Sequence, residues 1–108
     1  MLGRAGENLA QRHLKNKGYR LVGQNIRLFC GEVDLLMQDG NSLVIVEVKT
    51  KSSDIFGLAS DMVTLKKKRK LLQLGKALSQ KFPNKAVRID VVAIDKENIE
   101  HIVSAVEE

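Results

Sequence analysis

The sequence has few of the residues that build disulfides, backbone kinks and stacking surfaces. Its 108 residues include one cysteine, one proline, four aromatic side chains and no tryptophan. The lone Cys30 excludes an intrachain disulfide and is typical of a reducing compartment, so we expect a cytoplasmic protein. Four aromatic residues are too few for a protein that follows single strands by stacking base after base.

Long apolar segments are also absent. No run approaches the roughly 20 apolar residues that span a bilayer, and the N-terminus lacks the apolar stretch of a secretory signal. The two isolated histidines, with one cysteine, do not have the spacing of a structural zinc site. We therefore expect a single domain over residues 1–108, with no membrane partner.

The charge of the chain is positive and unevenly placed. The net charge is +5 and the isoelectric point is near 9.5, which favours a polyanionic partner. An unbroken basic run consists of Lys66, Lys67, Lys68, Arg69 and Lys70. We expect this run to contact the backbone of a nucleic-acid duplex as a group, with Lys51 and Arg27 as weaker candidates for phosphate contacts.

Hydrophobic periodicity and turn residues divide the chain into helices and strands. The predicted elements are a helix over 4–17, a strand over 19–29, strands over 33–38 and 43–50, a helix over 61–82, a strand over 86–95 and a short last strand or helical turn from 99. The first helix has an apolar stripe of Ala5, Leu9, Ala10 and Leu14. In the second, Asp61 would cap the N-terminus and Leu65, Leu72, Ala77 and Leu78 would face inward. The order α-β-β-β-α-β-β predicts an α/β fold, a mixed sheet flanked by helices.

The hairpin over residues 31–50 brings acidic side chains together. A loop at Asp39-Gly40 would place Asp34 diagonal to Glu47, whereas a loop at Gly40-Asn41, or a four-residue loop, would place the two directly opposite. In each case both carboxylates and Lys49 share one face, because side chains alternate along a strand. Two carboxylates about 5 Å apart repel by about 3 kcal/mol at an effective dielectric near 20.

A cation would relieve this repulsion, and hard divalent ions such as Mg²⁺ prefer carboxylate and carbonyl oxygens. The alternative is that Asp34 and Glu47 are solvated side chains on an exposed face of the sheet. Against it, Glu47 interrupts an apolar run typical of a buried strand, where an unpaired carboxylate is costly.

Several segments resemble a known family. Residues 31–36 (GEVDLL) and 44–51 (VIVEVKTK) resemble the PD-(D/E)xK nuclease signature, in the variant of the YraN family of uncharacterised bacterial proteins. Residues 3–10 resemble its first helix, 18–27 its first strand, 63–67 its second helix and 88–92 its fourth strand. The resemblance implies a restriction-endonuclease-like fold, similar in architecture to archaeal Holliday-junction resolvases. Valine stands before Asp34 where the motif's name has proline.

The resemblance also implies roles for individual residues. Asp34, Glu47 and the carbonyl of Val48 would hold Mg²⁺ or Mn²⁺. Lys49 would orient and help deprotonate the attacking water, and would stabilise charge on the phosphate. Glu7 matches an acid that binds metal or water in related nucleases. Its alternative role is that of a glutamate favoured by the dipole of the first helix.

Two further matches have structural alternatives. Lys67 matches a lysine that recurs in the family's second helix, but it also lies in the basic run, where a solvated helix face is the alternative. Arg88 and Asp90 lie two residues apart on one strand face, which favours a structural ion pair.

We therefore expect a metal-dependent endonuclease that hydrolyses phosphodiester bonds in duplex or branched DNA. The first alternative is a non-catalytic nucleic-acid-binding module of the same fold, and the second is an interaction protein whose basic face is incidental. A four-way or two-fold DNA substrate suits a homodimer, with residues 51–60 in the contact.

Overall fold

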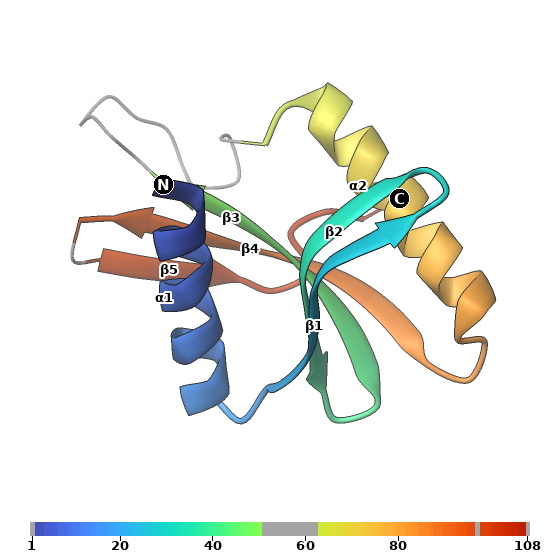
Figure 1. The fold of residues 1–108 in the computed structure, drawn as a ribbon, viewed down its shortest axis with the longest axis horizontal. Helices are drawn as coiled ribbons and strands as arrows, with labels where there is room; N and C mark the ends of the chain where they lie inside the picture. Colours follow the sequence, from blue (N-terminus) through green and yellow to red (C-terminus); the bar gives the residue numbers. More distant parts are fainter. Residues whose placement is uncertain (1, 51–62, 97, 108) are drawn as a thin grey trace.

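The computed structural model describes residues 2–50, 63–96 and 98–107, and the side chains from residue 5 onward. Within them the helices are α1 (Leu2–Asn16) and α2 (Leu65–Lys81), and the strands are β1 (Arg20–Leu28), β2 (Gly31–Asp39), β3 (Ser42–Thr50), β4 (Ala86–Asp95) and β5 (Asn98–Ile102) (Figure 1). The predicted order α-β-β-β-α-β-β is confirmed, and the last segment is a strand.

The strands form one mixed sheet in the order β1-β2-β3-β4-β5. Only β3 and β4 run parallel among these strands, and they pair along their length from Ser42↔Ala86 to Thr50↔Ile94. The other neighbours are antiparallel. Because parallel neighbours need a crossover connection, α2 lies between β3 and β4 in the chain and packs across the sheet. The predicted α/β class is confirmed.

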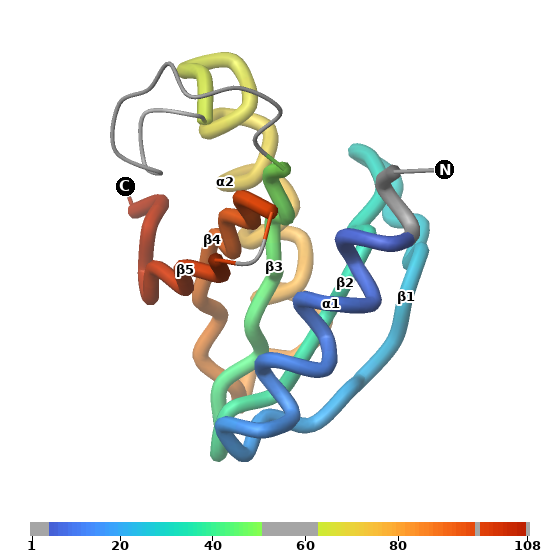
Figure 2. Tube along the Cα trace, turned by 90° about the vertical axis from the view of Figure 1, so that its left-hand side faces the viewer, coloured from blue at the N-terminus to red at the C-terminus, as the bar shows by residue number. Residues whose placement is uncertain are grey.

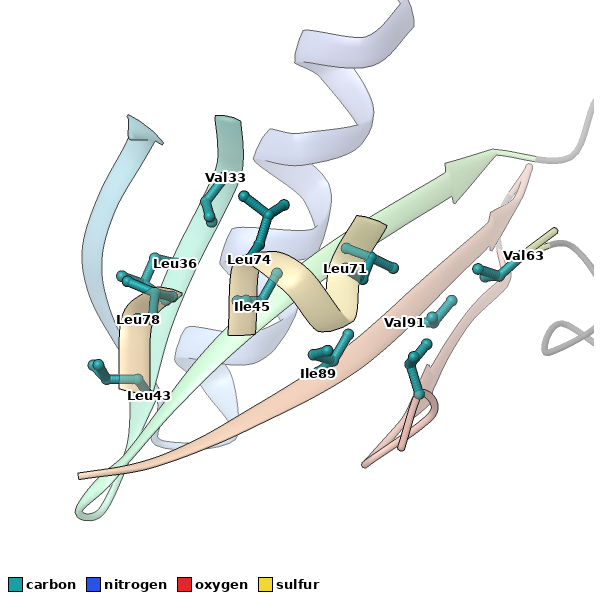
Figure 3. Close-up of a cluster of buried hydrophobic side chains, with 11 residues drawn as sticks. Val33, Leu36, Leu43, Ile45, Val63, Leu71, Leu74, Leu78, Ile89 and Val91 are labelled. Atoms are coloured by element: carbon teal, nitrogen blue, oxygen red, sulfur yellow. The ribbon is translucent and has the colours of Figure 1, made fainter. Parts of the chain in front are cut away.

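The two helices cover opposite faces of the sheet (Figures 1 and 2). On one face, Ala10 and Leu14 of α1 pack with strand residues that include Val44, Val46 and Val92. On the other face, α2 packs onto β2, β3 and β4, and Figure 3 shows this cluster. It includes Leu71, Leu74 and Leu78 of α2 with Val33, Leu36, Ile45, Ile89 and Val91. Burial on both faces explains the nearly continuous apolar run of β3.

The helix ends follow from their capping residues. Gly18 adopts φ +97 two residues after the end of α1, as expected for the predicted stop. At α2 the N-cap is Thr64, whose side chain accepts a hydrogen bond from the Lys67 amide. The predicted cap, Asp61, lies outside the described residues.

Three predicted inward positions are wrong. Leu9 is exposed, as is Ala5, and the buried stripe of α1 runs through Gly6, Ala10 and Leu14. Leu65 is also exposed, because at 100° per residue it lies about 240° around the helix from the buried Leu71.

Candidate metal and nucleic-acid site

The site lies where β2 and β3 separate. The two strands pair from Asp39↔Ser42 to Leu36↔Ile45, so the connecting residues are Gly40 and Asn41, one of the registers considered from the sequence. This register aligns Asp34 with Glu47, but the pairing ends before it reaches them. Beyond Leu36, β2 turns toward α2 while β3 continues beside β4 (Figure 1). The two acids therefore flank an opening in the sheet.

Glu47 is the buried acid of this opening. The residue is only 7% exposed, and its side chain faces α2, because Ile45 packs in the α2 cluster and Val46 in the α1 cluster. Its Oε2 atom has no hydrogen-bond partner among the described residues. The Lys67 ammonium lies 3.3 Å from this oxygen, so the two form an ion pair without hydrogen-bond geometry. A buried carboxylate held this loosely can accept a cation.

Lys67 therefore does not belong to a fully solvated helix face, which was the structural alternative considered from the sequence. It stands in the first turns of α2, with its side chain 41% exposed and its ammonium against the acid of β3. The sequence assigned it to the basic run as a DNA contact. Its contact with Glu47 had no sequence signal beyond its match to the family's second helix, since the contact depends on how α2 crosses the sheet.

Lys49 shares a basic cavity with α2. It follows Glu47 by two residues, which places both side chains on the α2 face, and it is half-buried. The cavity has a volume of about 690 Å³. It is lined by Lys49, Thr64, Lys66, Lys67, Arg69, Lys70 and Gln73. Of the predicted basic run, only Lys68 is missing from this lining, and the concentrated positive charge suits a phosphate backbone.

Asp34 lies on the other side of the opening and is exposed. Val33 packs in the α2 cluster whereas Leu35 packs in the α1 cluster. The regular alternation of side chains between the two faces of the sheet is therefore interrupted in β2 at Asp34. On β1, Asn25 has φ +53 at the same level, between the pairs Gln24↔Leu35 and Ile26↔Val33. Asp34 forms no ion pair with the described part of the chain.

No cluster of three or more His, Cys, Asp or Glu side chains suited to a metal occurs within the described residues.

Glu7 and Val48 approach from the α1 side of the sheet. The Cα of Gly6 lies so close to β3 that an added Cβ would be 3.1 Å from Thr50 Cγ2 and 3.4 Å from Val48 Cγ1. This close approach brings the half-buried Glu7, the next residue, to the end of β3 that carries Glu47 and Lys49. The Val48 side chain packs with the α1 cluster, which leaves its backbone carbonyl as the candidate metal ligand.

The remaining candidates lie apart from the opening. Arg27 is highly exposed on β1 and lies 3.8 Å from Glu32. Lys51, and the predicted dimer contact at residues 51–60, lie outside the described residues. Within the described chain, no helix has the length and apolar character needed to cross a membrane.

Comparison with known families gives one result. The model of the uncharacterised protein family UPF0102 matches residues 6–94, which include every predicted catalytic residue. The chain belongs to this family. A UPF0102 protein of Thermodesulfovibrio yellowstonii is 42% identical, with 96% of this chain and 94% of that protein covered. One from Persephonella marina is 36% identical over 95% and 90%. UPF0102 is the YraN family, so the family that the motifs resemble is confirmed.

The UPF0102 chain also contains a buried polar network, centred on the fully buried Asp90. Arg88 donates two hydrogen bonds to its carboxylate, at 2.9 and 3.0 Å, which confirms the predicted structural pair. The Ser104 amide donates a third at 3.0 Å. His101 Nε2 lies 2.7 Å from Asp90 and donates to it when Nδ1 accepts from the Lys17 ammonium, 3.0 Å away.

The network changes the ionisation of its members. Burial alone would raise the pKa of Asp90, but the hydrogen bonds from Arg88, Ser104 and His101 outweigh it and hold this pKa below its ordinary 3.8. The hydrogen bond to Asp90 also raises the pKa of Arg88. Sequence reasoning missed His101 as a member, because it joins the network only through the pairing of β5 with β4.

Proposed function

We propose that this chain is a metal-dependent endonuclease that hydrolyses phosphodiester bonds in DNA, with Mg²⁺ or Mn²⁺ as its cofactor. The observation that carries the proposal is Glu47, a buried carboxylate with an oxygen lacking a hydrogen bond, at an opening of the sheet beside a cavity lined by five cationic side chains. Proteins keep such a costly group where chemistry requires it.

The donor set suits a hard divalent ion. Asp34, Glu47 and the Val48 carbonyl would supply oxygen ligands, and Mg²⁺ is commonly held by one or two carboxylates with several waters. A cluster of three acids is therefore unnecessary. Metal binding at Glu47 requires the Lys67 ammonium to withdraw from its place 3.3 Å away, and its partly exposed side chain can turn toward a phosphate.

The chemistry is divided among the side chains of the site. When bound, the metal lowers the pKa of a water and polarises the phosphoryl oxygens. Lys49 would orient the attacking water and donate hydrogen bonds to a phosphate oxygen as charge develops. The attacking water would lose a proton to solvent as its oxygen bonds to phosphorus, one ester P–O bond would break, and the leaving oxygen would take a proton from solvent. The cations of α2 hold the flanking phosphates.

A cleavage panel tests this proposal. Purified protein is incubated with linear, flap and junction DNA, with Mg²⁺, Mn²⁺ or chelator. We expect metal-dependent cleavage that Glu47→Gln, Asp34→Asn and Lys49→Ala reduce by at least 100-fold. Lys81→Ala, which removes an exposed lysine at the far end of α2 from the cavity, is the matched control. Absence of cleavage on every substrate, or cleavage undiminished in Asp34→Asn, contradicts the proposal.

A second candidate, a non-catalytic nucleic-acid-binding module, has its own support. The Lys67 ammonium already neutralises Glu47, and Asp34 is exposed and without an ion pair to any described residue. This function predicts salt-sensitive DNA binding that needs no metal and survives Glu47→Gln. Fluorescence anisotropy with labelled duplex at increasing salt measures it.

The substrate, the oligomer and the compartment belong to the same proposal. Branched DNA is favoured by analogy of fold, and a homodimer suits two-fold substrates. The single cysteine favours the cytoplasm. Sedimentation that shows a monomer at high concentration would remove the homodimer.

A further inference from the structure

We propose that the β1–β2 turn carries a binding site for one unstacked nucleobase, centred on Phe29. The site would let the protein recognise a break or branch in DNA, where a base face is free. This inference rests on the proposed function in taking DNA as its occupant. It goes beyond that function by naming the feature of DNA that is recognised and the side chain that recognises it.

The exposure of Phe29 is the first observation. Its residue is 90% exposed, more than any other large apolar residue of the described chain. It stands in the tight turn that connects Leu28 to Gly31, which form the last pair of the hairpin. An aromatic ring presented fully to water gains most when a flat apolar partner covers it.

The turn is seated firmly on α2 (Figure 1). The Lys70 ammonium donates a hydrogen bond to the Cys30 carbonyl, and Cys30 Sγ lies 3.9 Å from the Gln73 carbonyl oxygen. Gly31 has φ +151, and a Cβ there would lie 2.7 Å from Lys70 Cε. Because the backbone beside Phe29 is anchored in this way, little conformational entropy is lost when the ring binds.

The hollow beside Phe29 has the chemistry of a base site. It has a volume of about 690 Å³ and is lined by Arg27, Leu28, Phe29, Gly31 and Glu32. An aromatic ring and a guanidinium plane both stack on bases, and a carboxylate accepts hydrogen bonds from an exocyclic amino group. Glu32 lies 3.8 Å from Arg27 and offsets its charge, which disfavours a phosphate in the hollow, so the base itself is the fitting occupant.

The position of the turn sets which DNA it can read. Lys70 both lines the basic cavity and bonds Cys30, so DNA held on the cations of α2 reaches Phe29. In an intact duplex, both faces of each interior base are already stacked. A flap, gap or junction offers a free face, and one aromatic side chain is enough to cover it.

A tryptophan reporter tests the site, since the chain has no tryptophan of its own. Phe29→Trp is titrated, without divalent cations, with a flap DNA and with a capped duplex of the same sequence, whose ends are closed by ethylene glycol linkers without nucleotides. We expect quenched emission with the flap and little change with the capped duplex. Phe82→Trp, at the other end of α2, is the control and should respond to neither.

Affinities measured by anisotropy complete the test. We expect Phe29→Ala and Phe29→Leu to weaken flap binding about tenfold and capped-duplex binding less than about twofold. The inference would be overturned by equal losses of affinity on both DNAs, or by an unchanged Phe29→Trp emission spectrum when the flap is bound. It would also be overturned if the Phe29→Trp spectrum changed with protein concentration in the absence of DNA.

These outcomes are separable from the proposed nuclease activity. Metal-dependent cleavage with flap binding unaffected in Phe29→Ala would overturn the base site and leave the nuclease intact. Quenching by the flap without cleavage would support the base site and count against the nuclease. Failure to bind any DNA at low salt would overturn both.

Discussion

Glu47 is unfavourable for the stability of the fold but necessary for the proposed function. It stands in β3 between residues that pack into the two apolar clusters, and its Oε2 atom has no hydrogen bond within the described structure. The nearby Lys67 is partly exposed, so solvent screens their attraction and the ion pair offsets little of the cost of burial. The acid therefore weakens the fold at the point where the proposed chemistry needs it.

Replacing Glu47 should separate the two effects. We expect Glu47→Gln to raise the free energy of unfolding by about 0.5–1 kcal/mol in chelator, because it removes a buried charge and leaves Lys67 free to be hydrated. Mg²⁺ should raise the melting temperature of the natural protein and not that of the variant. Thermal unfolding measures both, with the exposed Glu32→Gln as control. A loss of more than about 1 kcal/mol would instead make the Glu47–Lys67 pair structural.

For the individual residues of the candidate site, the sequence predicted some side-chain positions and missed others. Strand alternation placed Glu47 and Lys49 on one face, and the turn residues allowed the register that the structure has. The pairing of Lys67 with Glu47 was not predictable from local patterns, because it depends on the angle at which α2 crosses the sheet. The exposure of Asp34 follows from the reversal of β2 around it, for which the sequence has no period-2 signal.

Among the elements, α2 contributes to both the core and the proposed site. Leu71, Leu74 and Leu78 pack on the sheet, while the cations of its first two turns other than Lys68 line the basic cavity. The position of those cations depends on a well-formed first turn. Thr64 stabilises that turn by accepting a hydrogen bond of 3.1 Å from the Lys67 amide.

Removal of the cap should therefore affect two properties together. We expect Thr64→Ala to lower the free energy of unfolding by about 1 kcal/mol and to weaken DNA binding, because the first turn frays and Lys66 and Lys67 lose their fixed positions. Thr64→Ser keeps the acceptor oxygen and is the matched control. Urea unfolding and anisotropy measure the two effects. Weakened DNA binding with unchanged stability would indicate direct contact between the hydroxyl and DNA.

The elements themselves were largely predictable. The strand over 86–95 and the stop at Gly18 agree with the structure, because alternation and a glycine in the left-handed region are strong local signals. The inward face of α2 was placed partly wrong. Apolar residues occur on several sides of its basic sequence, and contact with the sheet decides which of them are buried.

For the molecule as a whole, the Asp90 network joins distant parts of the chain. Arg88 also bonds Asp39 on β2 at 3.0 Å and the Tyr19 hydroxyl before β1 at 2.6 Å, while His101 and Ser104 reach Asp90 from the C-terminal end. The sequence predicted only the Arg88–Asp90 pair. The other members meet through sheet pairing, which a single sequence does not specify.

This network predicts how stability depends on pH. The folded pKa of Asp90 lies below its unfolded value of 3.8, so the stabilisation is complete well above pH 3.8 and is lost as the pH falls through 3.8 toward the folded pKa. We expect Asp90→Asn to cost about 3–5 kcal/mol at neutral pH and to flatten this acid limb. Urea unfolding at several pH values measures both. Asp95→Asn, on the same strand, is the control, and an unchanged acid limb in Asp90→Asn would contradict the prediction.

The parallel pairing of β3 with β4 has a consequence for the order of folding. Their residues meet only after the chain between them, which includes α2, has closed into a loop, whereas the β1–β2 and β2–β3 hairpins form from neighbours in sequence. Contacts that are distant along the chain form late and slowly. Glu47 lies in β3, and Lys67 lies in the segment that this closure folds back onto the sheet. In a refolding experiment, the proposed binding of metal or DNA should therefore return only after the hairpins have formed.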